Sequence, residues 1–243
     1  MVLDMHFHLA GKEVPDVDSG VRTRGCVVSK CQAQNTSCLE FSSRTGAACA
    51  LYADPFTDEL TDIIHLVAKK RVFSYNHLER VGYSELNRFD RLLELSASVG
   101  IAAVLHLSHH GSERFKMSEA DACLDHVSRR FPNLTVIISH LGGENCACAL
   151  SYARALQNMY LDTSRLRETT ARLGFSSPTE TLRLISDALP VTRLLYGSDL
   201  TWPDNQYDRA ESEVFGHFFS AHEVDGILHS NASSILSRLQ EAE

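Results

Sequence analysis

The sequence contains no block of Lys or Arg residues and no apolar run that approaches membrane-spanning length. Its 23 basic and 31 acidic residues give a formal net charge of −8 over 243 residues. This acidic balance argues against binding to nucleic-acid phosphates. The start Met is followed at once by a strand-like apolar segment, which lacks the basic region and the long apolar region of a secretory signal. We therefore expect a cytoplasmic protein with no nucleic-acid or membrane partner.

The cysteines lack the pattern of a disulfide framework or of a zinc finger. Seven is an odd number, and Cys146 and Cys148 have no second cysteine pair at finger-type spacing. The sequence also shows no internal repeat, low-complexity tract or linker. Residues 1–243 are therefore predicted to form a single domain with reduced thiols.

Eight short apolar runs recur along the chain and are typical of strands buried on both faces of a parallel sheet. They cover residues 2–8, 24–29, 47–53, 72–76, 101–107, 134–140, 159–163 and 193–198. Helical patterns lie between them at residues 58–70, 86–99, 119–131, 147–157 and 178–189. The alternation predicts the α/β class and a parallel (β/α)8 TIM barrel. Residues 32–46 are the weakest part of this prediction, because they show no full helix.

The first apolar run ends in two histidines at strand spacing. Because residues i and i+2 of a strand point to the same face, His6 and His8 are predicted to project together, with Met5 and Phe7 on the other face. Imidazole is the commonest metal-binding side chain. The pair therefore predicts half of a metal site.

Three later runs also end in residues of the ligand type. These are His106, His140 and Asp199. Because active-site residues of a TIM barrel lie at the carboxyl ends of its strands, all of these side chains are expected at one face. A histidine buried in the core needs a hydrogen-bond partner and adds little stability over a Leu. A functional site is therefore the better explanation of four strand ends of this kind.

Several segments occur in an order that resembles a known family. They are residues 4–8, 105–106, 130–134, 140–143, 160–164, 195–199 and 231–232. Together they resemble the amidohydrolase superfamily, and within it the amidohydrolase-related (amidohydrolase 2) branch typified by aminocarboxymuconate-semialdehyde decarboxylase. The resemblance implies a metal-dependent enzyme.

The resemblance also implies a set of metal ligands. One divalent ion, most often zinc, is expected on His6, His8, His106 and Asp199, although such donors also suit manganese or iron. His140 is expected beside the water that the metal activates, as a catalytic residue, or alternatively as a further ligand. A mononuclear site is favoured, because the fourth run ends at Asn76 and His77 without the lysine that bridges two metals in some relatives.

Asp199 is expected to act as a general base, taking the proton of the attacking water and delivering it to the leaving group. His140 is expected to hydrogen-bond that water or to polarise a substrate carbonyl. Asp162 and Ser164, which end the seventh run, are expected to orient neighbouring side chains.

Four further residues are candidates for substrate binding. His77 is either a substrate contact or a solvated histidine, and Trp202 either lines the substrate site or packs in the core. Arg165, with Arg167 as a second candidate, either holds a substrate carboxylate or is a solvated loop residue.

The resulting hypothesis is a metal-dependent hydrolase that cleaves an amide, ester or lactone bond of a small molecule. A metal-dependent decarboxylase of a small unsaturated or aromatic carboxylic acid is the first alternative. A noncatalytic ligand-binding barrel is the second, and the complete ligand set argues against it. The oligomeric state is left open between a monomer and a homo-oligomer, since many members of the family are dimers or tetramers.

Overall fold

A computed structural model describes residues 2–11, 13–15, 25–53, 74–76, 87–107, 117–201 and 209–241. It contains an eight-stranded sheet in which every strand pairs in parallel with the next strand of the sequence. The strands are β1 (Asp4–Phe7), β2 (Gly25–Val28), β3 (Ala48–Tyr52), β4 (Ser74–Asn76), β5 (Ala102–Leu105), β6 (Val136–Ile138), β7 (Met159–Asp162) and β8 (Leu194–Leu195). Each lies within one of the eight apolar runs, so the strand prediction is confirmed.

Residues directly after β8 join the sheet back to β1. Met5 N–H donates to the Tyr196 carbonyl at 2.8 Å, and Asp199 N–H donates to the His6 carbonyl at 2.7 Å. His8 also forms a parallel bridge with Thr201. These bonds close the ring of strands, as the predicted TIM barrel requires.

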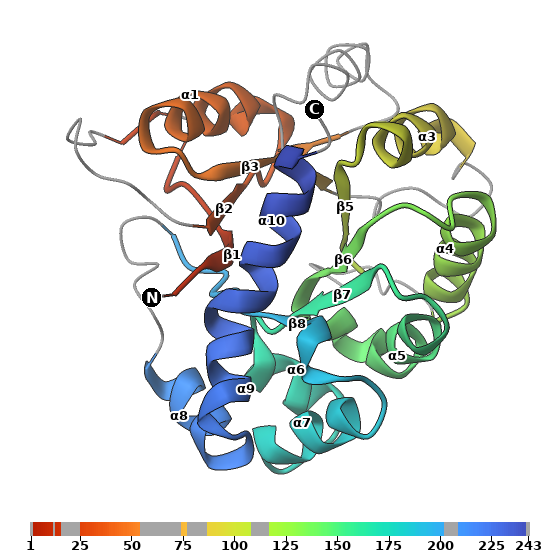
Figure 1. The fold of residues 1–243 in the computed structure, drawn as a ribbon, viewed down its shortest axis with the longest axis vertical. Coiled ribbons are helices and arrows are strands. Elements are labelled where there is room, and N and C mark those ends of the chain that lie inside the picture. The colour runs from red at the N-terminus through yellow and green to blue at the C-terminus, as the bar shows by residue number, and fades with distance from the viewer. Residues whose placement is uncertain are drawn as a thin grey trace.

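Helices surround the strands (Figure 1). They are α1 (Asn35–Thr45), α3 (Asp90–Val99), α4 (Met117–Arg130), α5 (Cys146–Ala155), α6 (Leu166–Arg172), α7 (Pro178–Ser186), α8 (Arg209–Phe218), α9 (Ala221–Asp225) and α10 (Asn231–Glu241). Four of the predicted helices correspond to α3, α4, α5 and α7, and the one predicted at residues 58–70 lies outside the described residues. No helix in the described part of the chain is both long enough and apolar enough to cross a membrane.

The expectation that residues 32–46 lack a full helix is wrong, because α1 occupies eleven of them. Its inner face buries Cys38 and Phe41 beside Ser37 and Thr45. The Thr45 hydroxyl donates to the Phe41 carbonyl at 2.8 Å, so this buried polar group is satisfied within the helix. A face made partly of Ser and Thr gives a weak apolar period, which explains the missing sequence signal.

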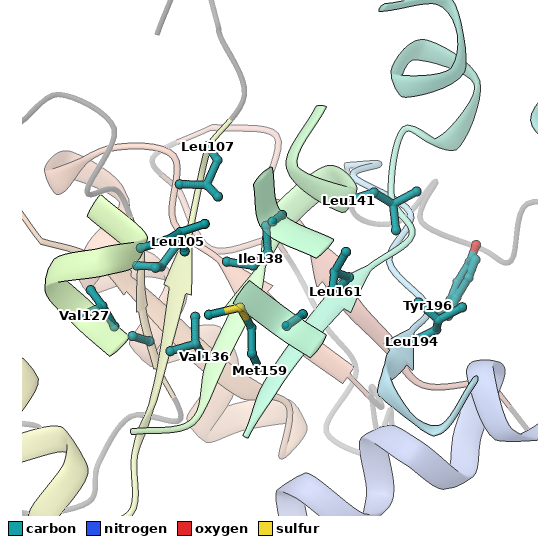
Figure 2. Packing of buried hydrophobic residues seen from close by; sticks show 14 of the residues in the cluster. Leu105, Leu107, Val127, Val136, Ile138, Leu141, Met159, Leu161, Leu194 and Tyr196 are labelled. Carbon is teal, nitrogen blue, oxygen red and sulfur yellow. The ribbon is translucent and has the colours of Figure 1, made fainter. Parts of the chain in front are cut away.

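The apolar side chains of the strands are divided between two layers, one on each face of the sheet. The outer layer packs between strands and helices, and Figure 2 shows part of it, with Leu105, Ile138 and Leu161 on successive strands and Val127 on α4. The inner layer fills the barrel and is formed by Leu3, Met5, Cys26, Val28, Ala50, Ala102, Val104, Ile137, Tyr160, Leu195, Ala232 and Ile235.

The prediction that Met5 shares a face with Phe7 is wrong. Met5 belongs to the inner layer, whereas Phe7 packs in the outer layer with its ring centroid 6.0 Å from that of Phe41. The pairing register of β1 is irregular between Asp4 and Phe7, and such an irregularity changes the face to which a side chain points.

The C-terminal segment closes the end of the barrel at which the strands begin. A π-helical turn (Gly226–Ser230) supplies the carbonyl of Leu228 to Leu3 N–H at 2.8 Å and the carbonyl of Ile227 to Tyr196 N–H at 3.0 Å. The following helix, α10, runs across the ring of strands (Figure 1) and contributes Ala232 and Ile235 to the inner layer. This end is therefore filled by protein, and the carboxyl ends of the strands remain for a site.

Candidate metal centre

The structure brings together all five ligand-type residues that the sequence analysis placed at strand ends. His6 lies in β1, and His8 and His106 directly follow β1 and β5. His140 and Asp199 stand in the short segments that follow β6 and β8. The four histidines are 1–5% exposed. Two sets of three ligand atoms lie within 4.8 Å of one another, namely His6 with His106 and His140, and His6 with His8 and Asp199. His6 belongs to both sets and stands at the centre of the cluster.

The backbone is strained where two of these side chains enter the site. His140 has a φ of 56° and Asp199 a φ of 57°, in the left-handed region that residues other than glycine rarely adopt. Each such conformation costs on the order of 1–3 kcal/mol and persists only where surrounding contacts enforce it. The backbone conformations that direct the His140 and Asp199 side chains into the site therefore lower the stability of the fold.

Asp162, the last residue of β7, orients the central histidine, His6. Its Oδ2 lies 2.9 Å from Nδ1 of His6, so this nitrogen carries a proton and Nε2 faces the cluster. Nε2 is buried and makes no hydrogen bond with any described residue. Burial opposes protonation, yet the carboxylates of Asp162, Asp199 and Asp4 raise the pKa of His6. The negative charge around His6 therefore favours a cation at this point.

The contact between His8 and Asp199 gives a sharper test of fit to a metal. His8 Nδ1 lies 2.6 Å from the Val28 carbonyl, which can only accept, so Nδ1 carries the proton. Burial lowers the pKa of His8 to about 4, and the neutral ring then presents a lone pair at Nε2. That atom lies 2.7 Å from Asp199 Oδ1. Two lone pairs at this distance require a shared proton or a metal ion, and the chemistry of the donor set, imidazoles with a carboxylate, fits a divalent metal.

His106 joins the cluster from the end of β5. Its ring centroid lies 5.5 Å from that of His6 and 4.9 Å from that of His140. The strand end is fixed by Asn145, whose side-chain N–H donates to the Leu107 carbonyl at 2.6 Å. His106 is thus held at the same depth as the other imidazoles.

Asp4 fastens β1 to the turn that carries Asp199, a role that the sequence analysis did not assign. Its carboxylate accepts from the backbone N–H of Ser198 at 2.9 Å and from the Ser198 hydroxyl at 2.6 Å. It also accepts from the His6 N–H at 3.1 Å. Burial outweighs these bonds and raises the pKa of Asp4 to about 6. The position of Asp4 within the motif was visible in the sequence, but its partner 194 positions away was not.

Gly197 provides the space in which His6 packs against the end of β8. A Cβ at this position would lie 2.8 Å from the His6 Cβ and 3.2 Å from the Ser164 Cβ. We predict that Gly197→Ala displaces His6 and lowers the free energy of unfolding by about 1–3 kcal/mol, as overpacking does. Urea unfolding measures this loss. Gly11→Ala is the control, because no atom of the described residues beyond its chain neighbours lies within 4 Å of its Cβ. Equal midpoints for both variants would contradict the prediction.

Arg165, predicted to contact substrate, lies at the rim against Asp199. Its Nε donates to Asp199 Oδ2, and its Nη1 donates to Glu168 at 3.2 Å. Arg172 links Glu168 to Glu144 through contacts of 2.5 and 2.6 Å. Arg165 is thus engaged by two protein carboxylates.

Of the remaining substrate-binding candidates, Arg167 is exposed on α6. His77 and Trp202 lie outside the described residues.

Comparison with known proteins relates this arrangement to a family. The family model described as amidohydrolase matches residues 4–238. No curated protein matches the chain.

Solved structures share the barrel. An amidohydrolase from Burkholderia multivorans with bound zinc has a TM-score of 0.67 and 16% identity, over 98% of this chain and 99% of that one. A TIM-barrel protein from Bordetella bronchiseptica has a TM-score of 0.69 and 16% identity, over 91% of this chain and 80% of that one. Dihydroorotase from Campylobacter jejuni has a TM-score of 0.63 and 12% identity, over 97% and 83%. At these identities the likeness establishes the fold alone.

Proposed function

The chain belongs to the amidohydrolase family, whose members are metal-dependent enzymes, and we propose that it hydrolyses an amide, ester or lactone bond of a small molecule. The observation that carries the proposal is the convergence of buried imidazoles on Asp199, with His8 Nε2 and Asp199 Oδ1 facing each other at 2.7 Å. Such an arrangement is costly for folding unless a cation completes it.

His6, His8, His106 and Asp199 are the proposed ligands of one divalent metal. Zinc is the proposed ion, supported by the imidazole-rich donor set, and manganese or iron are the alternatives. When bound, such an ion supplies Lewis acidity that lowers the pKa of a water molecule and polarises a substrate oxygen.

Asp199 is the proposed general base. Its Oδ1 faces the histidines while Arg165 holds Oδ2, so the carboxylate has a fixed orientation. It takes the proton of the attacking water and returns it to the leaving group.

His140 is the proposed second catalytic residue. Burial lowers the pKa of its imidazole to about 3, so the ring is neutral at physiological pH. A neutral imidazole in this position accepts a hydrogen bond from the water and holds it toward the substrate carbonyl.

Decarboxylation of a small unsaturated or aromatic acid is the alternative, in line with the resemblance to the aminocarboxymuconate-semialdehyde decarboxylase branch. That reaction needs a cationic side chain for the substrate carboxylate. Arg165 already donates to Asp199 and Glu168, and this engagement favours hydrolysis. His77 and Trp202 stay proposed substrate contacts.

Several further features stay predictions. They are a single domain over residues 1–243, a homo-oligomeric assembly, a cytoplasmic location and the lack of nucleic-acid or membrane partners.

The proposal is tested with protein reconstituted with zinc, manganese or iron and offered a panel of lactones, amides, esters and unsaturated or aromatic acids. We expect cleavage of a member of the first three classes, loss of activity after chelation and recovery on adding metal back. Release of carbon dioxide from an acid substrate would establish the decarboxylase instead. A chain that binds no metal after reconstitution would contradict both enzymatic proposals.

A further inference from the structure

The hydroxyl of Ser164 connects a catalytic candidate to the carboxylate beneath the site. Ser164 follows β7 and is completely buried, with 0% of its surface exposed. Its Oγ lies 2.8 Å from Nδ1 of His140 and donates a hydrogen bond to Oδ1 of Asp162. The three side chains therefore form a continuous buried chain.

The direction of this chain follows from the donors available. A carboxylate only accepts, and a serine hydroxyl has one proton, so that proton goes to Asp162. The Ser164 oxygen must then accept from His140, which places the imidazole proton on Nδ1. In the neutral ring, Nε2 is consequently the acceptor.

Asp162 serves both sides of the site through its two oxygens. Oδ2 receives Nδ1 of His6 at 2.9 Å. Oδ1 receives the Ser164 hydroxyl and also the backbone N–H groups of His140 and Ser164, each at 3.0 Å. One carboxylate is thus linked directly to His6 and, through Ser164, to the His140 ring.

We infer that Ser164 is a positioning residue, which holds His140 in the Nδ1–H tautomer by passing its hydrogen bond to Asp162. This inference rests on the proposed function, because it assigns a purpose to the acceptor at Nε2 of His140. In that tautomer Nε2 accepts a hydrogen bond, so the ring can hold the attacking water. The opposite tautomer would present a donor and would lack a partner for Nδ1 at Ser164.

The test uses zinc-loaded protein labelled with nitrogen-15 in histidine, whose ring-nitrogen chemical shifts report the tautomer. The resonances of His140 are identified by their loss in His140→Gln. The wild type is expected to show a protonated Nδ1 and an unprotonated Nε2. Ser164→Ala is expected to move His140 to a mixture of tautomers or to the Nε2–H form.

Thr169→Val is the matched control. The Thr169 hydroxyl donates at 2.9 Å to the backbone carbonyl of His140 and not to its ring, and Thr169 is also buried. This variant removes a buried hydroxyl that also contacts His140, but it is expected to leave the tautomer of the His140 ring unchanged. A general disturbance of packing would affect both variants alike.

Kinetics separate positioning from substrate binding. Outer partners of a metal site typically contribute 10- to 100-fold, so kcat of Ser164→Ala should fall by about that factor. KM and zinc content should stay within about twofold. Asp162→Asn should lose zinc as well, because it also removes the partner of His6.

The inference is overturned if the wild type shows an unprotonated Nδ1 on His140, a result that does not depend on the folding of Ser164→Ala. It is equally overturned if Ser164→Ala keeps the wild-type tautomer. Failure of the proposed function is a separate result, since it shows as absent zinc or absent turnover. The tautomer can then be read from the metal-free protein.

Discussion

Asp199→Asn is expected to retain the fold and to lower turnover by about 10²- to 10⁴-fold, the range that a positioned general base contributes. An amide cannot take the proton of the attacking water. It also lacks the charge that faces His8 at 2.7 Å and Arg165 on the other side. The measurement is kcat per bound metal ion, so that weaker metal binding by the variant is not counted as lost catalysis.

The control for this variant is Asp187→Asn, which makes the same chemical change at an exposed position at the end of α7. It should keep the wild-type rate and the wild-type unfolding curve. A near-normal rate for Asp199→Asn would remove Asp199 from the proton-transfer role.

His106→Ala is expected to remove most of the bound metal, whereas His140→Ala is expected to keep the metal and lose turnover. The loss at His106 should exceed the 10- to 100-fold drop in affinity typical of outer partners, because a coordinating atom itself is removed. Elemental analysis of purified protein measures the metal content, and competition with a chelator measures the affinity.

His126→Ala controls for the loss of an imidazole. His126 pairs with Asp90 at 2.6 Å on the outer helices α3 and α4, so its removal should leave the metal content unchanged. Equal metal loss in His106→Ala and His140→Ala would make His140 a ligand. The two overlapping sets of ligand atoms around His6 make this a real alternative.

The strands were predictable because strands buried on both faces read as continuous apolar runs, and this pattern depends only on local sequence. The cluster of His6, His8, His106, His140 and Asp199 followed from the rule that the strands of a barrel end at one face. Neither step required knowledge of a long-range contact.

All but one of the failures have the opposite origin, because they depend on contacts between segments that are far apart in the sequence. The inner position of Met5 depends on an irregular register between β1 and β2, and no periodicity in β1 reveals it. The partnership of Asp4 with Ser198 and the tight space at Gly197 both depend on the closing contact between β1 and the segment after β8. The helix α1 was missed because hydroxyl side chains replaced part of its apolar stripe.

The closing contact between the first strand and the segment after β8 also determines when the site can form during synthesis. His8 and Asp199 stand 191 positions apart in sequence, so a nascent chain holds half of the proposed ligand set long before the other half leaves the ribosome. Contacts of such separation form late, because the loop entropy must be lost before they contribute. Uptake of a metal at the proposed site would thereby be coupled to the final steps of folding, and a truncated chain that ends before Asp199 would carry the histidines without the proposed carboxylate ligand.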